Sequence, residues 1–374
     1  MTKTITSLIF CLLFVASTLE AQQVVTGRIT DRYDGTPIPG ATVFIAHTTV
    51  GTLSDRYGNF SITAPIQGNF IVVVSHIGFQ SASRTIDTPQ PFHQVNFTLQ
   101  ENILDEVVVT PCIPHERREE ELFWRLFLGE SPSNRGMQVL NPEVVRFCLL
   151  PIGILRVFAD EPIEIINHNM GYHISYILYY FEHDFRTLDF FIAGEPFFTE
   201  LTPQNRRQER SWERERRNAY FTSLARFIRA LYQEQLYESG LFLAKDLMNR
   251  LVPLSLTQAD SIRMRVPTNA MDAATTFTYS HILHRYTEAV RVNIEQPLLL
   301  GFIPRTITYA MFREPNRTLL NPREILPLVR LFPSNFIIYS DGSYSGVLHL
   351  NDYRNTVIGL RTRLPMEFRM NEEH

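Results

Sequence analysis

Short runs of residues that favour β-strands follow one another closely between residues 23 and 100. Val, Ile, Thr and Phe fill these runs, while Gly, Pro and Asp stand between them. Branched and aromatic side chains suit a half-buried sheet surface, and the intervening residue types favour turns. The runs include residues 24–30, 41–46, 51–54, 60–63, 70–75 and 94–99. About seven short strands in one segment predict a β-sandwich, which we assign to residues 22–101.

Three motifs in this segment resemble a known domain family. They are Pro39–Val43, Ser54–Phe60 and Ser75–Phe79. In combination they are similar to the carboxypeptidase regulatory-like domain, which implies an all-β transthyretin-like sandwich. In Bacteroidota this domain often opens TonB-dependent receptors and other envelope proteins, so the resemblance implies a place in the cell envelope. It implies no peptidase activity, because in zinc carboxypeptidases the module accompanies a separate catalytic domain.

An apolar run from Leu8 to Ala16 lies near the start of the chain and follows the positive charge of Lys3. The run is too short to span a bilayer, which takes about 20 apolar residues. With the small residue Ala21 at a suitable cleavage point, residues 1–21 have the pattern of a secretory signal peptide. An uncleaved anchor is the alternative. We therefore expect an exported protein, in the periplasm or associated with the outer membrane, whose membrane contact is peripheral at most.

Two cysteines, Cys112 and Cys148, lie beyond the signal segment. In an exported protein they could form a disulfide, which would contribute roughly 3–4 kcal/mol in the chain-entropy model. Two buried free thiols are the alternative, because a sequence does not give the distance between two side chains. Both interpretations stay open at this point.

Residues 102–121 are assigned as a linker that contains a candidate docking strand. In outer-membrane receptors with this N-terminal domain, a similar stretch precedes the plug and resembles the segment that meets TonB. Such a strand would bind by adding itself to an exposed sheet edge. A strand that belongs to the sandwich or to the next domain is the simpler interpretation, since no plug-like sequence follows. The docking strand would consist of Asp105, Glu106, Val107, Val108, Val109 and Thr110.

The remaining residues, 122–374, mix helical and strand patterns, so they predict an α+β domain and make the chain α+β as a whole. The amphipathic segment Leu122–Leu128 predicts a helix that ends at Gly129. Pro162–Glu182 predicts a hairpin, and Asp341–Gly342 predicts a tight turn. Further strands are expected at residues 189–192, 197–201, 288–294, 305–312, 335–339 and 346–350.

A long helix is expected from Gln208 to Glu238, because apolar residues recur there at helical spacing. Between residues 204 and 229 the sequence has eight arginines and three glutamates. One interpretation is a face that binds phosphate, an acidic glycan or a carboxylate. The alternative is an ordinary solvated face in which Glu213 and Arg217 pair one turn apart. The predicted contact residues are Trp212, Arg214, Arg216, Arg217 and Tyr220.

The arginine-rich segment also carries a second resemblance. The spacing of Trp212, Arg217 and Tyr220, together with Asn167–Tyr172 and Leu364–Phe368, is similar to a group of Bacteroidota envelope proteins with an uncharacterised C-terminal region. This resemblance spans most of the chain. It implies no established activity, so no functional residue is carried over from it.

Patterns for catalysis or metal binding are weak. His281, His284 and Glu288 would share one face of a helix, but their surroundings predict strands, on which the two histidines point to opposite faces. Residues 342–346 resemble a nucleophile elbow, but Tyr344 stands where serine is required. The sequence therefore predicts no catalytic residue, no metal site and no cofactor.

The net charge of −4 over 374 residues argues against a nucleic-acid binder. Hydrophobic residues make up 44%, which supplies ordinary folded cores. We predict an exported, non-enzymatic protein of the cell envelope, a binding or interaction module whose partner is an envelope protein or a glycan. The alternatives are a hydrolase with an unrecognised site in the C-terminal domain and a component linked to TonB-dependent uptake.

Overall fold

The computed structural model describes the first two thirds of the chain in long stretches and the rest in short ones. The described residues are 23–66, 68–86, 90–101, 112–129, 136–186, 190–221, 223–236, 239, 241–247, 250–253, 255–256, 276–277, 283–285, 289–294, 298–302, 326–331, 334–339, 343–347, 350–351, 363–366 and 368. The predicted signal peptide (1–21), the candidate docking strand (Asp105–Thr110), the turn at 341–342 and the expected strand at 305–312 lie outside them. Among the described residues, no helix is long and apolar enough to cross a membrane.

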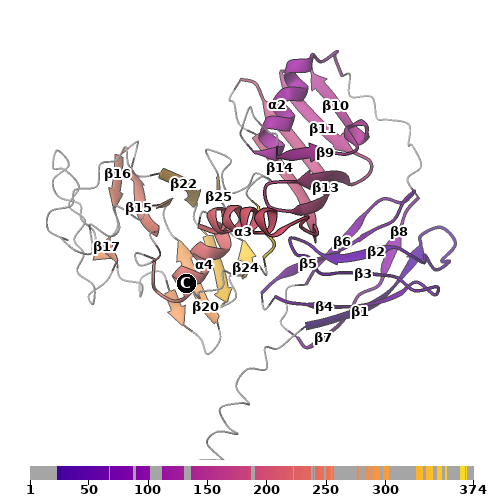
Figure 1. Ribbon diagram of the computed structural model, residues 1–374, viewed down its shortest axis with the longest axis horizontal. Coiled ribbons are helices and arrows are strands. Elements are labelled where there is room, and N and C mark those ends of the chain that lie inside the picture. Colours follow the sequence, from indigo (N-terminus) through magenta and orange to yellow (C-terminus); the bar gives the residue numbers. More distant parts are fainter. Residues whose placement is uncertain are drawn as a thin grey trace, which may run out of the picture.

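Residues 23–99 fold into the predicted β-sandwich (Figure 1, lower right). Its strands are β1 (Gln23–Asp31), β2 (Thr42–Ile45), β3 (Gly51–Leu53), β4 (Asn59–Ala64), β5 (Phe70–Ser75), β6 (Ala82–Ile86), β7 (Phe92–Gln94) and β8 (Phe97–Leu99). One sheet has the order β4-β1-β7, with β8 also paired to β1, and the other has the order β3-β2-β5-β6. The residues of β4 alternate between exposed and buried, as the period of two in a strand requires. Fully buried Val25, Val43, Val72 and Leu99 belong to the core that the sheets enclose.

The turn between β3 and β4 gives the Ser54–Phe60 motif a structural role. The backbone N–H groups of Tyr57 and Asn59 each donate to Asp55 Oδ1 at 2.8 Å. These hydrogen bonds, the one from Asn59 foremost, hold the pKa of Asp55 below its ordinary value. Gly58 has a φ of +76°, and a Cβ there would lie 2.4 Å from the carbonyl oxygen of Ile29. The turn therefore requires glycine at this position.

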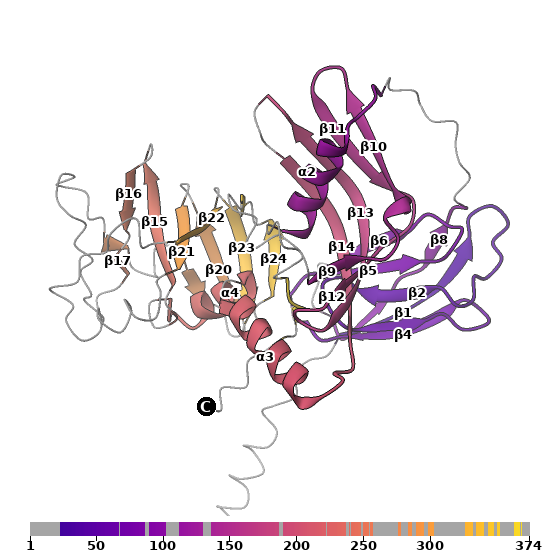
Figure 2. The same ribbon diagram turned by 45° about the horizontal axis from the view of Figure 1, so that its top comes forward.

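A six-stranded sheet forms a second unit beside the sandwich (Figure 2). Its strands are β9 (Met137–Val139), β10 (Val145–Leu150), β11 (Ile154–Ala159), β12 (Ile163–Asn167), β13 (Tyr172–Asp184) and β14 (Phe190–Glu200). Strands β11 and β12 lie end to end along one edge of the long β13, and β14 lines its other edge. The hairpin predicted at residues 162–182 is confirmed as β12 and β13.

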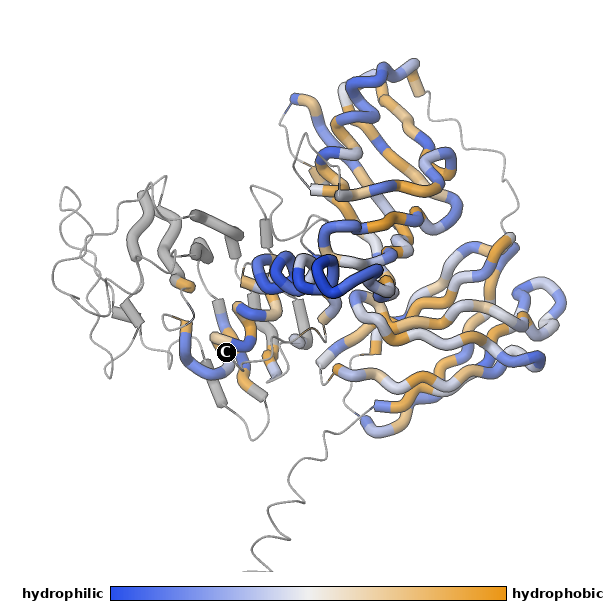
Figure 3. Tube along the Cα trace, viewed as in Figure 1, coloured by the Kyte–Doolittle hydropathy of each residue, from blue (hydrophilic) through white to orange (hydrophobic). Residues whose placement is uncertain are grey.

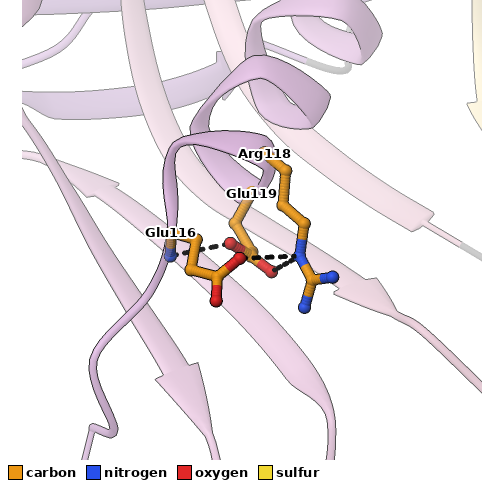
Figure 4. A network of polar contacts seen from close by, with 3 residues as sticks. All are labelled: Glu116, Arg118 and Glu119. Carbon is orange, nitrogen blue, oxygen red and sulfur yellow. Dashed lines mark hydrogen bonds and ion pairs between the residues drawn. The ribbon is translucent and has the colours of Figure 1, made fainter.

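Helix α2 (Arg117–Leu128) covers one face of this sheet and stacks Phe123 and Phe127 against its aromatic residues. The helix starts five residues earlier than predicted, inside the segment assigned as a linker. Glu119 closes its first turn by accepting hydrogen bonds from the Glu116 N–H at 2.7 Å and from Arg118 at 2.8 Å (Figure 4). Burial alone would raise the pKa of Glu119, but these hydrogen bonds outweigh burial and lower it.

A disulfide joins Cys112 to Cys148 of β10. The N–H of Ile113 also donates to the carbonyl of Leu149, so the chain ahead of α2 is fixed to the edge of the second sheet. The disulfide settles the alternative that the sequence left open.

The expected helix at 208–238 is instead two helices, α3 (Arg206–Phe221) and α4 (Leu224–Tyr232). The prediction of one continuous helix was wrong because Ser223 adopts an extended conformation and caps α4, its hydroxyl accepting from the N–H of Arg226. Serine competes for backbone hydrogen bonds in this way and so favours helix starts over helix interiors.

The C-terminal strands form further sheets next to α4 (Figure 2). A four-stranded sheet has the order β19 (Leu283–Arg285), β20 (Ala289–Ile294), β23 (Ser334–Tyr339) and β24 (Tyr344–Val347). This confirms the strands expected near 288–294 and 335–339. A five-stranded sheet has the order β16 (Arg250–Pro253), β15 (Leu241–Leu247), β21 (Leu298–Phe302), β22 (Leu326–Leu331) and β25 (Leu350–Asn351). A further pair consists of β17 (Ser255–Leu256) and β18 (Thr276–Phe277).

The outer edge of β14 meets the sandwich. Pro196 accepts a hydrogen bond from the N–H of His47 at 2.8 Å, and the N–H of Phe198 donates to Thr48 at 3.0 Å. The rings of Phe44 and Phe197 lie 4.9 Å apart across this junction. Two strands separated by Gly-Glu-Pro were expected here, and that prediction was wrong. Pro196 lies on an edge of the sheet where no ladder hydrogen bond from a backbone N–H is required. The strand therefore continues through the proline as β14.

Candidate functional site

Helix α3 is anchored on the turn between β12 and β13. The indole Nε1–H of Trp212 donates to the carbonyl of His168 at 2.7 Å, and the Trp212 side chain is buried. Within the turn, Asn167 Oδ1 accepts from the N–H groups of Asn169 and Met170. The structure thus brings together Trp212 and the Asn167–Tyr172 motif, which are far apart in the sequence.

Arg216 extends this anchor one helical turn further along α3. Its Nε donates to the carbonyl of Met170 at 2.7 Å, and its Nη2 donates to that of Gly171 at 3.2 Å. The guanidinium also lies over the ring of Tyr172, 4.1 Å from the centroid, and pairs with Glu200 at 3.3 Å. The side chain is only 13% exposed. Arg216 was predicted as a ligand contact, whereas the structure uses its Nε, Nη1 and Nη2 donors within the protein.

Tyr220 makes the contacts at the other end of α3. Its hydroxyl accepts from Arg229 of α4 at 3.0 Å, and its ring lies 6.0 Å from that of Phe368. Arg229 also donates to the carbonyls of Met366 and Phe368, each at 3.2 Å. Tyr220 therefore joins α3, α4 and the C-terminal segment, and it too is an internal contact.

The opposite side of α3 is an exposed row of arginines, which we call the arginine face. Arg207, Arg210, Arg214 and Arg217 follow one another at separations of three and four residues, which places them on one side of a helix. Arg214 lies 3.8 Å from Glu215, and among the described residues the others have no carboxylate within 4 Å. The pairing of Glu213 with Arg217, expected for a purely solvated face, is not formed. Arg206 is also exposed, at the start of the helix, so the arginine face consists of Arg206, Arg207, Arg210, Arg214 and Arg217. Figure 3 shows the strongly hydrophilic course of α3.

A polar groove of about 560 Å³ runs between the first turns of α3 and the β12–β13 turn. Asn205 caps the helix, since its Oδ1 accepts from the N–H groups of Arg207 and Gln208. Amide and hydroxyl groups dominate the lining, and such groups both donate and accept hydrogen bonds. The lining residues are His168, Asn169, Gln204, Asn205, Arg207, Gln208, Ser211, Trp212 and Glu215.

A second polar cluster, which the sequence analysis missed, surrounds Glu164. Ser175 donates to Glu164 Oε1 at 2.7 Å, and His173 Nε2 lies 2.7 Å from Glu164 Oε2. The carboxylate stands between serine and histidine, so histidine cannot take the serine proton as it does in a catalytic triad. The hairpin register, which pairs Glu164 with Ser175 and Ile166 with His173, was the signal that could have revealed the cluster.

The weak chemical motifs of the sequence find no support in the described part of the chain. His284 lies in strand β19, while His281 and Glu288 are outside the described residues. Ser343, from the segment resembling a nucleophile elbow, accepts a hydrogen bond from the N–H of Gly68 at 2.9 Å. Within the described residues, no group of three or more His, Cys, Asp or Glu side chains is placed to hold a metal ion.

Comparison with known proteins identifies the N-terminal domain. Residues 25–109 match the family model of the CarboxypepD_reg-like domain. The TonB-dependent receptor SusC of Bacteroides thetaiotaomicron is 38% identical over 99 residues, which are 26% of this chain and 9% of the receptor. A TonB-dependent receptor of Formosa agariphila is 37% identical over 98 residues, again 26% of this chain and 9% of the receptor. The match with this chain therefore spans about a tenth of the length of each receptor.

Among solved structures, the 5-hydroxyisourate hydrolase of Klebsiella pneumoniae is 14% identical with a TM-score of 0.19. The similarity covers 22% of this chain and 92% of the hydrolase. The residues of α3 lie outside the matched family model, so the family match does not extend to the arginine face.

Proposed function

We propose that this chain is an exported, non-enzymatic protein of the cell envelope that binds an acidic glycan through the arginine face and the adjoining groove. One observation carries the proposal. Helix α3 uses Trp212, Arg216 and Tyr220 to fix itself in the fold, while Arg206, Arg207, Arg210 and Arg217 extend into solvent with no carboxylate within 4 Å among the described residues. A rigidly held row of guanidinium groups is suited to planar anions such as carboxylate, sulfate and phosphate.

The composition of the groove supports a glycan as the partner. Sugar hydroxyls need groups that donate and accept, and the groove supplies amides from Asn169, Gln204 and Gln208 and the hydroxyl of Ser211. Arg207 belongs to both the groove and the arginine face. A polar chain with regularly spaced acidic groups could therefore pass from the groove onto the arginine face.

The proposed location rests on the N-terminal domain. The family match and the similarity to TonB-dependent receptors support an envelope-associated role, with the periplasm or the outer membrane as the site of action. The matched segment reaches residue 109 and so includes most of the candidate docking strand. Docking of that strand on a TonB-type partner remains a second proposal, and residues 105–110 lie outside the described residues.

A charge-reversal experiment tests the glycan proposal. Arg214→Glu combined with Arg217→Glu changes two exposed side chains of the arginine face and leaves the anchor residues intact. Binding is measured on immobilised heparin, as a polyanion probe, and on neutral dextran. We expect salt-sensitive binding of the unmodified protein to heparin only, and loss of that binding in the double variant.

A matched control is available on α2. Arg117 and Arg125 are also exposed helical arginines, and reversing both changes the net charge by the same amount. This control should keep heparin binding. If both double variants lose heparin binding equally, the effect comes from net charge alone. If the unmodified protein and both variants bind heparin equally, the arginine face is not the binding surface. Crosslinking in native cell envelopes would then show whether a protein partner is captured in place of a glycan.

A further inference from the structure

A small cavity of about 250 Å³ lies where four parts of the chain meet. The turn after β2 contributes His47, helix α2 contributes Leu126 and Phe127, and the C-terminal segment contributes Arg363. Strands β13 and β14 contribute the remaining walls, which are Tyr176, Tyr179, Ile192, Ala193, Gly194 and Glu195. The cavity is separate from the arginine face and its groove.

His47 is held in an unusual conformation at the mouth of this cavity. Its φ of +64° lies in the left-handed region, which residues other than glycine rarely adopt. Its N–H donates to Pro196 and its carbonyl accepts from the N–H of Met366, both at 2.8 Å. Its Nε2 lies 2.8 Å from Glu195 Oε2. Contacts on both sides thus fix the imidazole next to the carboxylate, and strain of this kind is common at functional sites.

The cavity carries one anion, Glu195, and one cation, Arg363, and the two are not in direct contact. Burial and the charge of Arg363 both lower the pKa of His47, so the imidazole is neutral near pH 7 and can donate to Glu195. Arg363 hydrogen-bonds the hydroxyl of Tyr176, whose pKa burial raises far above its ordinary value, so that hydroxyl also stays neutral. Among the described residues, no carboxylate oxygen lies within 4 Å of Arg363. The guanidinium therefore makes no direct contact with a carboxylate of the described residues.

We propose that this cavity binds a small aliphatic monocarboxylate, with its carboxylate on Arg363 and its hydrocarbon chain against Leu126, Phe127 and Ile192. A guanidinium and a carboxylate match in a two-pronged hydrogen-bonded pair, which is strongest away from bulk water. The size of the cavity is sufficient, because an apolar cavity of about 150 Å³ is enough to hold benzene in another protein. The side chains of Leu126, Phe127 and Ile192 offer no hydrogen-bond partner to a charged group at the far end of the ligand.

Isothermal titration of the full-length protein with hexanoate tests the proposal. Hexan-1-ol keeps the hydrocarbon and removes the charge, while 6-aminohexanoate keeps the carboxylate and charges the far end. We expect saturable binding of hexanoate and much weaker binding of both analogues. Arg363→Gln should weaken hexanoate binding about 10- to 100-fold, because it removes a charge-assisted hydrogen bond. Arg125→Gln, an exposed change of the same charge on α2, should have no effect.

Several results would overturn the carboxylate site. They are hexan-1-ol binding as tightly as hexanoate, 6-aminohexanoate binding more tightly than hexanoate, and no saturable binding of hexanoate at millimolar concentration. Full retention of hexanoate binding by a folded Arg363→Gln protein would have the same consequence. The comparison of the three ligands uses the unmodified protein, so it decides the question even if the variant fails to fold.

Discussion

The indole of Trp212 occupies the space that a side chain at Gly171 would need. A Cβ built on Gly171 would lie 2.3 Å from the Trp212 ring, and the glycine has a φ of +70°. Two requirements, a left-handed backbone and close approach of an aromatic ring, therefore meet at one residue. The attachment of α3 to the second sheet depends on it.

Gly171→Ala should destabilise the protein by about 2–5 kcal/mol, because it adds a steric clash to an unfavourable backbone conformation. Gly153→Ala is the matched control, since Gly153 has a φ of +77° but no atom within 4 Å of the added Cβ. It should cost about 1 kcal/mol. Urea unfolding of both variants measures the difference, and equal losses would show that Trp212 makes no contribution.

Arg216→Lys should cost about 1–3 kcal/mol, because lysine cannot reproduce the forked contacts with Met170 and Gly171. Arg214→Lys, on the exposed side of the same helix, should change the free energy of unfolding by no more than about 0.5 kcal/mol. Thermal and urea unfolding check both values. If Arg216→Lys changes the free energy of unfolding only slightly, Arg216 does not hold α3 in place and is again a candidate ligand contact.

Two histidines should give the stability opposite dependences on pH. Burial, with the charge of Arg363, lowers the pKa of His47 in the folded state, although Glu195 acts in the other direction. The unfolded chain then binds the proton more readily, so this contribution is complete above pH 6.5 and is lost as the pH falls. Glu164 raises the pKa of His173, so its contribution is complete below pH 6.5 and is lost as the pH rises through the folded pKa.

Single variants separate these two contributions. His47→Asn, in which asparagine tolerates the positive φ, should flatten the acidic side of the stability profile. His173→Gln should flatten the neutral side. Unfolding free energies measured from about pH 5 to about pH 8 test both expectations. A slope below pH 6.5 that persists in His47→Asn would contradict the assignment of that slope to His47.

Replacing the disulfide should cost about 3–4 kcal/mol, because it closes a separation of 36 residues between Cys112 and Cys148. The change is Cys112→Ala with Cys148→Ala, and the measurement is thermal unfolding with and without a reductant. The reductant should lower the melting temperature of the unmodified protein and leave the double variant unchanged. A reductant effect that survives in the double variant would point to a cause other than this bond.

Much of the fold follows from local patterns in the sequence. The sandwich strands and the β12–β13 hairpin were predictable because turn residues and a period of two mark them clearly. The break between α3 and α4 was not, since Thr-Ser in the middle of an apolar helical pattern is decided by one capping hydrogen bond. The continuity of β14 depends on its place at an edge, which is a tertiary property.

The candidate site was only partly predictable for a related reason. The sequence identifies α3 as rich in arginine, but it does not say which arginines are used to hold the helix. The spacing of four residues between Trp212 and Arg216 placed them on one face, and that was the available signal. The distinction from Arg214 and Arg217 required the carbonyl groups of residues 168–171, which come from a hairpin far away in the sequence. The cavity with Arg363 joins four segments and could not be predicted at all.

The C-terminal segment determines when the packing of the sandwich and the second sheet can be finished. Leu364 packs on the core of the second sheet, Met366 packs on the core of the sandwich, and the N–H of Met366 donates to His47. During synthesis the sandwich emerges first and can fold early, as N-terminal domains do. Its contact with residue 366 must wait until that residue has been made. The carbonyl of His47 is therefore satisfied by Met366 only late, and a nascent chain that ends before residue 366 would leave it without this hydrogen bond.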